Sequence, residues 1–270
     1  NRRALSLALA CVATLAVLAG ALLVALAVPV SRAIIDAVVA WDPLIRLGLD
    51  VPNPYRVVIY SAVFGVLTIG LYLMSLRLGG ILGWMFQKEG PLELLTAMLE
   101  LAAAAWSVAA ARRWYRRGRP FVRSVPTLYV LLGVVLFLVA MEELNWGQTL
   151  FAFETPPSWA AINYQQETSL HNLLSMQSLA WTQHVLAALF GAGALGLIAL
   201  AIKVPRSMFV AIAPAACVAP VAVLCALGGA FLHSEVFELL FAIFFAFYSF
   251  RIFVAAGSAE APEAKGNYRD

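Results

Sequence analysis

A polar stretch at residues 140–174 holds many of the side chains in this chain that could do chemistry. It begins with two adjacent acids, Glu142 and Glu143, at the end of a long uncharged run. On a helix, Glu142 would share a face with Asn145 and Trp146, whereas Glu143 would point about 100° away. Adjacent acids at a helix C-terminus oppose the helix dipole, so we expect a cation, a metal, an arginine or protonation to compensate them. The alternative is a solvated helix end.

Both acids are candidates for a catalytic base or a ligand. The polar side chains that follow them could bind a substrate or orient the acids. The predicted binding residues are Asn145, Trp146, Gln148, Asn163, Gln165, Glu167 and Asn172.

A third candidate catalytic acid, Glu100, falls inside an apolar segment at residues 91–111. Glu93, Thr96 and Ser107 lie roughly on the same helical stripe. Ionisable groups near the middle of a membrane are costly; they face the bundle interior and mark a pathway or a site. The alternative is a neutral Glu100 that donates a hydrogen bond between helices.

Further acids and histidines could supply metal ligands. Glu235 and Glu238 are three residues apart, so both can face one way at the start of an apolar segment, although Ser234 and Glu235 also suit a helix N-terminus. Histidine with glutamate suits zinc or a related divalent metal. No HExxH or HxxxH pair is present, and His184 suits a hydrogen-bonded interior position. The candidate metal ligands are His171, Glu143, His233, Glu235 and Glu238.

Membrane-spanning helices must position these groups. The chain has 270 residues, of which 63% are hydrophobic and 12% charged, whereas soluble domains carry about 25% charged residues. We predict one all-α transmembrane domain at residues 1–256, with an interfacial loop at 146–175 and a disordered tail at 257–270. Residues 77–90 are too short to span. The seven predicted spans are about 4–30, 55–76, 91–111, 124–144, 176–202, 207–231 and 235–255.

Positive charges predict the orientation of this bundle. An arginine cluster at 112–123, then Lys203 and Arg251, would lie on the cytoplasmic side of a bacterial inner membrane. The C-terminus would then be cytoplasmic and the polar stretch would face outward. Seven spans would also require an outward N-terminus, whereas Arg2 and Arg3 favour an inward one, so the orientation of the first span stays open.

The polar stretch also resembles a pattern in a group of uncharacterised bacterial polytopic membrane proteins. That pattern runs Glu-Glu-x-x-Trp-Gly-Gln, Thr-Pro, Asn-x-Gln-x-Glu and Leu-His-Asn, and the resemblance covers mainly residues 88–175. It implies a multi-span membrane protein and no particular activity. The matching positions are Glu142, Glu143, Trp146, Gly147, Gln148, Thr155, Pro156, Asn163, Gln165, Glu167, His171 and Asn172.

Three functions fit these features. The first is an outer-facing polar site, dependent on a divalent metal such as zinc, that acts on a lipid or lipid-linked substrate. The second is a non-catalytic subunit that meets other membrane proteins through the loop. The third is a proton- or ion-coupled transporter that uses Glu100. The chain lacks GxxxxGK[ST] and GxGxxG nucleotide loops, and its net charge of +3 gives no broad basic face for nucleic acid.

Overall fold

The computed structural model describes residues 53–86, 90–116, 124–151, 153–163, 166–170, 173, 182–203, 214, 218–231 and 234–258. Within these ranges all the secondary-structure elements are helices. The single β-type contact there is an isolated bridge between Asn163 and Leu173. The predicted first span and nearly all of the predicted tail lie outside the described residues.

Four helices are long and apolar enough to cross a membrane: α3 (Pro54–Leu78), α5 (Pro91–Tyr115), α6 (Ser124–Glu143) and α13 (Ser234–Ser258). They coincide with four of the predicted spans, so the predicted all-α fold is confirmed over the described residues, and these four helices are compatible with an integral membrane protein. Their lengths follow from composition, since a run of about 20 apolar residues covers the hydrocarbon core.

Two further helices occupy the regions of two other predicted spans. These are α10 (Thr182–Lys203), which contains the apolar stretch Leu189–Leu200, and α12 (Ala219–Phe231). Helix α12 has 13 residues, and the apolar stretch of α10 is also shorter than the roughly 20 residues that cross a membrane. The predicted number of seven spans therefore stays a prediction.

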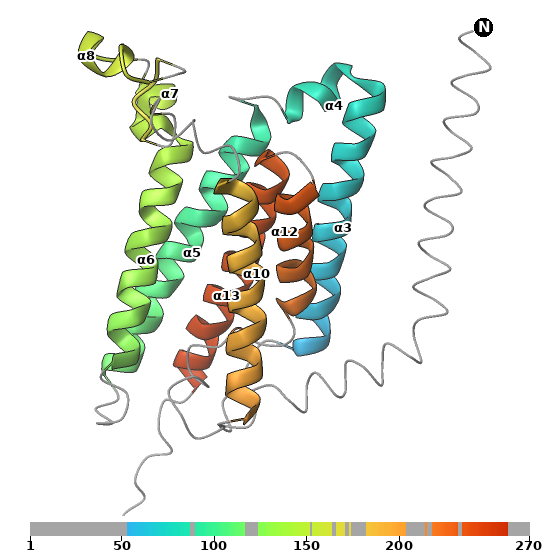
Figure 1. Ribbon diagram of the computed structural model, residues 1–270. Coiled ribbons are helices and arrows are strands. Elements are labelled where there is room, and N and C mark those ends of the chain that lie inside the picture. Colours follow the sequence, from blue (N-terminus) through green and yellow to red (C-terminus); the bar gives the residue numbers. More distant parts are fainter. Residues whose placement is uncertain are drawn as a thin grey trace, which may run out of the picture.

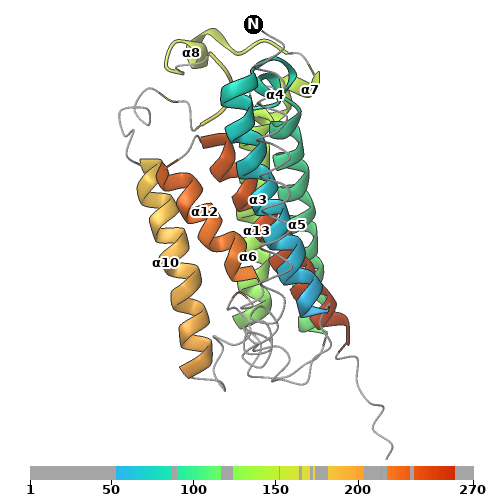
Figure 2. The same cartoon turned by 90° about the vertical axis from the view of Figure 1, so that its right-hand side faces the viewer.

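The bundle is built around α5 and α13, which lie side by side and run in the same direction (Figure 1). Helix α6 packs on α5 and runs the opposite way, while α12 packs on α13 and also contacts α3 and α10 (Figure 2). Short helices lie near one end of the bundle: α4 (Gly80–Met85), α7 (Gln148–Phe151) and α8 (Pro157–Ala160).

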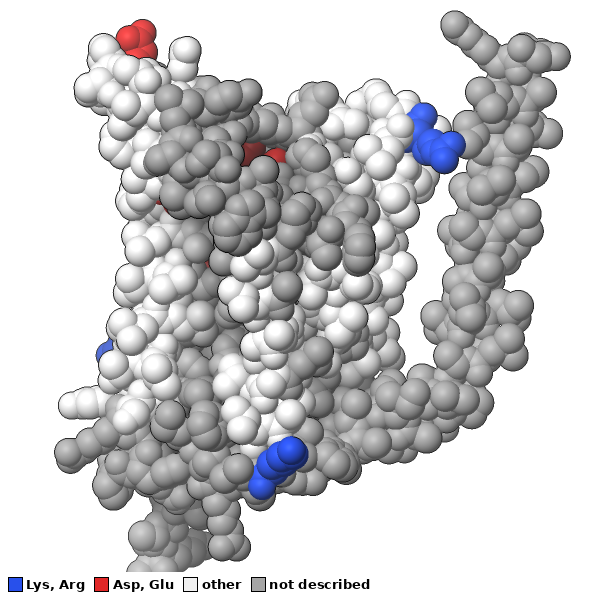
Figure 3. Space-filling model, in the orientation of Figure 1, with Lys and Arg blue, Asp and Glu red and all other residues white. Residues whose placement is uncertain are grey.

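Charges separate between the two ends of the bundle. We call the end that holds the first turns of α5 and α13 the acidic end, because Glu93, Glu142, Glu143, Glu235 and Glu238 lie there. We call the opposite end the basic end. It holds Arg56, Arg112, Arg113, Arg116, Lys203 and Arg251. On the face that Figure 3 shows, the described surface between these ends is largely uncharged. Arg77, in the last turn of α3, is a basic exception near the acidic end.

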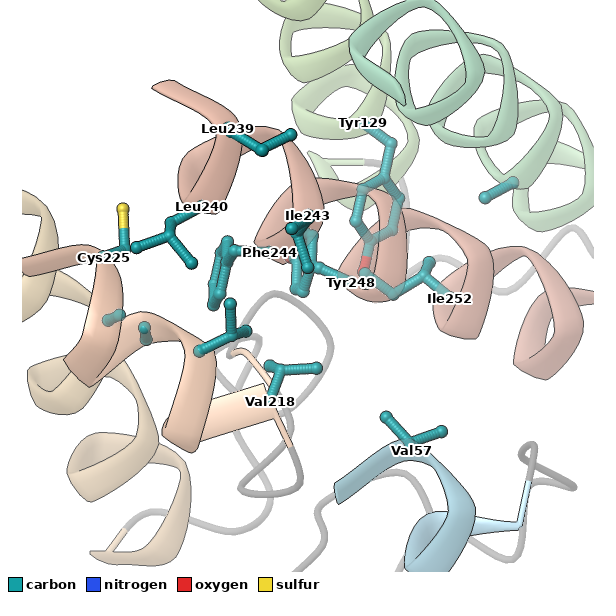
Figure 4. Close-up of a cluster of buried hydrophobic side chains, with 14 of the residues drawn as sticks. Val57, Tyr129, Val218, Cys225, Leu239, Leu240, Ile243, Phe244, Tyr248 and Ile252 are labelled. Atoms are coloured by element: carbon teal, nitrogen blue, oxygen red, sulfur yellow. The ribbon is translucent and has the colours of Figure 1, made fainter. Parts of the chain in front are cut away.

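Aromatic rings from α13 fill the core. Phe244 stacks on Tyr248, and Phe190 of α10 packs edge-on against Phe244 with ring centroids 4.9 Å apart. Tyr129 of α6 approaches the same cluster (Figure 4). Such aromatic pairs contribute about 0.5–1.5 kcal/mol each beyond the area they bury. The aromatic stripe of α13 therefore packs internally.

Small residues let α5 come close to its neighbours. A Cβ atom at Gly133 of α6 would lie 2.7 Å from Val108 Cγ2 and 3.1 Å from the Ala104 carbonyl oxygen. Beside this contact, the Ser107 hydroxyl donates a buried hydrogen bond of 2.9 Å to Ser249 of α13. Close backbone approach and interhelical hydrogen bonds are the usual means of packing helices in lipid.

Candidate functional site

The polar stretch begins with an unusual backbone turn at the acidic end. Helix α6 stops at Glu143, and Asn145, Trp146 and Gly147 then have φ values of 47°, 55° and 89°. A left-handed conformation suits glycine but is uncommon for tryptophan, so surrounding contacts must hold it. Helix α7 follows directly and turns the chain away from the axis of α6.

Glu142 supplies two of these contacts. Its Oε1 accepts a hydrogen bond from the Trp146 indole Nε1, and its Oε2 accepts one of 2.6 Å from the Leu170 backbone N–H. The predicted proximity of Glu142 and Trp146 is therefore confirmed, although the helix ends between them. Both carboxylate oxygens bind loop donors, so Glu142 connects the end of α6 to residues 166–170.

Gln148 extends this connection. Its Nε2 donates to Thr155 Oγ1 at 2.9 Å, and its Oε1 accepts bonds of 3.1 Å from both the backbone N–H and the hydroxyl of Thr168. The same hydroxyl also lies within hydrogen-bonding distance of the Asn145 carbonyl oxygen. The loop therefore has a hydrogen-bonded scaffold of its own.

Asn163 organises the second half of the loop. It is buried, its Nδ2 donates to the Ser169 carbonyl oxygen at 2.7 Å, and its Oδ1 accepts the Glu167 backbone N–H at 3.2 Å. Sequence reasoning missed Thr168 and Ser169 as members of this scaffold. No local pattern marks them, because their partners lie 6 to 23 residues away.

Glu143 has different surroundings from Glu142. It interacts electrostatically with Glu238, Glu100, Glu235 and Glu93, which come from α5 and α13. Glu100 in turn interacts with Glu238. Three helices thus bring five predicted or neighbouring acids together, and we call Glu93, Glu100, Glu143, Glu235 and Glu238 the carboxylate cluster.

Helix dipoles explain only part of this cluster. Glu93 and Glu235 lie in the first turns of α5 and α13, where the positive ends of the dipoles favour acids. Glu143 lies at the C-terminus of α6, where the dipole disfavours a negative charge, and the two neighbouring N-termini offset this in part. Glu100 and Glu238 lie deeper, beyond the first turn.

Glu100 is the most enclosed acid of the cluster. It is 1% exposed, and its Oε2 has no hydrogen-bond partner within the described part of the protein. Thr96 and Ser107 are also buried on α5, which confirms that they share an inward-facing stripe with Glu100. A buried carboxylate oxygen with no donor is costly, so this position suits a cation, a proton or a water molecule.

Several predicted site residues cannot be placed. His171, His233, Gln165 and Asn172 lie outside the described residues, and His184 lies in α10 at a position whose side chain is not described. Among the described residues, no group of three or more His, Cys, Asp or Glu side chains is arranged to hold a metal ion. The zinc site and the metal-dependent enzyme therefore stay predictions.

The arrangement divides the predicted residues into two groups. Glu142, Asn145, Trp146, Gln148 and Asn163 build the loop, whereas the carboxylate cluster faces the space between α5, α6 and α13. Acids held at different depths can bind a cation or pass protons between them.

The chain matches no protein-family model, no curated protein and no solved structure. The functional argument accordingly rests on the geometry of the carboxylate cluster.

Proposed function

We propose that this integral membrane protein binds a cation, either a proton or an ammonium ion, at its carboxylate cluster, and that the cluster is the coupling site of an ion-coupled transporter. The observation that carries the proposal is Glu100. Its side chain is 1% exposed, one of its oxygens lacks a hydrogen-bond partner among the described residues, and acids from two other helices face it.

The physical argument is charge balance. Neighbouring carboxylates repel one another, and the low dielectric inside a helix bundle strengthens that repulsion. Among the described residues, no basic side chain contributes to the electrostatic interactions of Glu100 and Glu143. A mobile cation that neutralises the cluster would remove this electrostatic repulsion. Because the charge balance would then depend on a mobile ion, ion entry could be coupled to a conformational change.

The orientation of the bundle determines where the cation comes from. The basic end carries Arg112, Arg113 and Arg116 at the last turn of α5 and Lys203 at the end of α10. By the positive-inside rule, we propose that this end faces the cytoplasm. The carboxylate cluster would then receive cations from the opposite side of the membrane.

The test is thermal unfolding of the purified protein against cation concentration and pH. A ligand that binds the folded state at 100 times its Kd adds about 2.7 kcal/mol of stability, which corresponds to a rise in Tm of roughly 5–10 °C for a chain of this size. We expect at least one of ammonium and the proton to give such a rise. Glu100→Gln and Glu238→Gln should each remove at least half of it.

The matched control is Glu154→Gln, because Glu154 is an exposed acid on the same side of the bundle and outside the cluster. This variant should keep the full shift. A wild-type Tm that responds to none of these cations would contradict the proposal, and so would an equal loss of the shift in Glu154→Gln.

A further inference from the structure

A groove on the outer surface of the bundle runs between α5 and α6. It encloses about 580 Å³, within the range of roughly 300–1,000 Å³ that is typical of small-ligand sites. Its floor includes the buried residues Ala104 and Gly133, and its exposed walls include Val108, Val134 and Phe137. The groove is therefore apolar and opens away from the bundle, on the side that faces lipid.

One end of the groove carries a charge. Arg112 of α5 lines it and is exposed, and Arg116 follows one turn later, also exposed. The neighbouring Arg113 is already engaged, because its Nη1 donates to the Phe253 carbonyl oxygen at 2.8 Å and its guanidinium lies 3.7 Å from the centre of the Phe253 ring. Within the described residues, the Arg112 side chain has no hydrogen bond or ion pair.

The length of the groove matches one half of a bilayer. From Leu101 to Arg112, α5 rises about 16 Å at 1.5 Å per residue, and half of the hydrocarbon core is about 15 Å. An acyl chain that lies in the groove would therefore end near the mid-membrane while its headgroup lies beside Arg112. A guanidinium is well suited to a phosphate, with which it forms paired hydrogen bonds.

We propose that the groove between α5 and α6 binds one acyl chain of an anionic phospholipid from the leaflet at the basic end, with the lipid phosphate held by Arg112. Zwitterionic lipids carry the same phosphate, but their positive headgroup amine is repelled by a basic end, so the basic end favours an anionic lipid. The proposal concerns the opposite end of the protein from the carboxylate cluster and does not depend on it.

The experiment compares lipid retention by native mass spectrometry. Purified protein is incubated with phosphatidylglycerol or phosphatidylcholine of the same acyl chains. The wild type should retain phosphatidylglycerol about fivefold better, as expected for one arginine at an anionic headgroup. Arg112→Gln should remove that preference. Ala105→Leu, which puts bulk into the groove without changing its charge, should lower the retention of both lipids.

The matched control is Arg56→Gln, which removes an exposed arginine at the basic end on α3, outside the groove. It should keep the preference for phosphatidylglycerol. An equal loss in Arg56→Gln would show that general surface charge is responsible and would overturn the proposal. Full competition by glycerol phosphate without an acyl chain, or a lipid-free dimer as the main species, would overturn it as well.

Discussion

At the scale of single residues, two adjacent acids have separate partners. Glu142 binds the Trp146 indole and the Leu170 backbone, whereas Glu143 faces acids on α5 and α13. The difference arises because α6 ends between these acids and the left-handed turn that begins at Asn145. Glu142 is thereby a positioning residue for the loop, and Glu143 belongs to the carboxylate cluster.

Replacing Glu142 with alanine should therefore loosen the loop. Hydrogen bonds to a charged acceptor contribute about 1.5–3 kcal/mol each when buried, and the partial exposure of Glu142 reduces this to about 1–2 kcal/mol in total. We expect the Leu170 amide to exchange with deuterium roughly five to thirty times faster, measured by hydrogen–deuterium exchange mass spectrometry. Glu154→Ala is the control and should leave this exchange unchanged. Unaltered exchange in Glu142→Ala would contradict the role assigned to Glu142.

At the scale of helices, the close contact between α5 and α6 positions the cluster. Gly133 lies against Ala104 and Val108 in the middle of this contact. The spacing of the two helices there determines how Glu143, at the end of α6, approaches Glu100 on α5. A wider interface would separate the two acids without changing either of them.

Gly133→Ala should accordingly destabilise the bundle by about 1–3 kcal/mol, because its Cβ would overlap Val108 Cγ2 and force the helices apart. The measurement is the midpoint of unfolding in a denaturing detergent. Gly70→Ala on α3 is the matched control, since no atom lies within 4 Å of its added Cβ. That variant should be neutral or more stable by about 0.5–1 kcal/mol, the usual gain from replacing a helical glycine. Equal stability in the two variants would show that Gly133 is not a close-contact position.

At the scale of the whole molecule, the charges define two unlike membrane faces. Acids and the hydrogen-bonded loop lie at one end, and most of the described arginines and lysines lie at the other (Figures 1 and 3). Since cytoplasmic loops are enriched in arginine and lysine, the basic end should face the cytoplasm.

Cysteine labelling of intact cells tests this orientation. On a background in which the three native cysteines are replaced, Ser158→Cys at the acidic end should react with a membrane-impermeant maleimide added outside. Arg116→Cys at the basic end should react only after the cells are opened. Ser158 and Arg116 are both exposed, so access across the membrane is the difference between them. The reverse labelling pattern would invert the proposed direction of cation entry.

The sequence predicted the helices well because their signal is local. Long apolar runs predicted α3, α5, α6 and α13 to within a few residues, and the position of Glu100 within such a run predicted an inward-facing acid. The sequence also predicted that Glu142 and Trp146 lie close together, although Trp146 reaches Glu142 from the turn that follows α6 and not along a continuous helix. Each of these features depends on neighbours in the chain or on one turn of helix.

The loop and the carboxylate cluster could not be predicted in this way, because they depend on contacts between distant parts of the chain. The left-handed turn at Asn145 and Trp146 is held by groups such as Thr168 and Leu170, which no helical periodicity connects to it. The role of Asn163 as a loop support likewise arises from contacts made after folding, and its predicted binding role stays a prediction. Which acids converge could be decided only by the pairing of α5 with both α6 and α13.

The depth of Glu100 also has an electrical consequence. Glu100 lies about 14 Å along α5 from Pro91, which is nearly half of the roughly 30 Å hydrocarbon core. One elementary charge that crosses the whole membrane gains about 2.3 kcal/mol per 100 mV, so a cation that reaches Glu100 would gain about 1 kcal/mol. A voltage of about 100 mV, negative on the side of the basic end, would then tighten cation binding roughly fivefold. Because Glu100 is buried at this depth, the occupancy of the cluster by a cation would depend on the membrane potential.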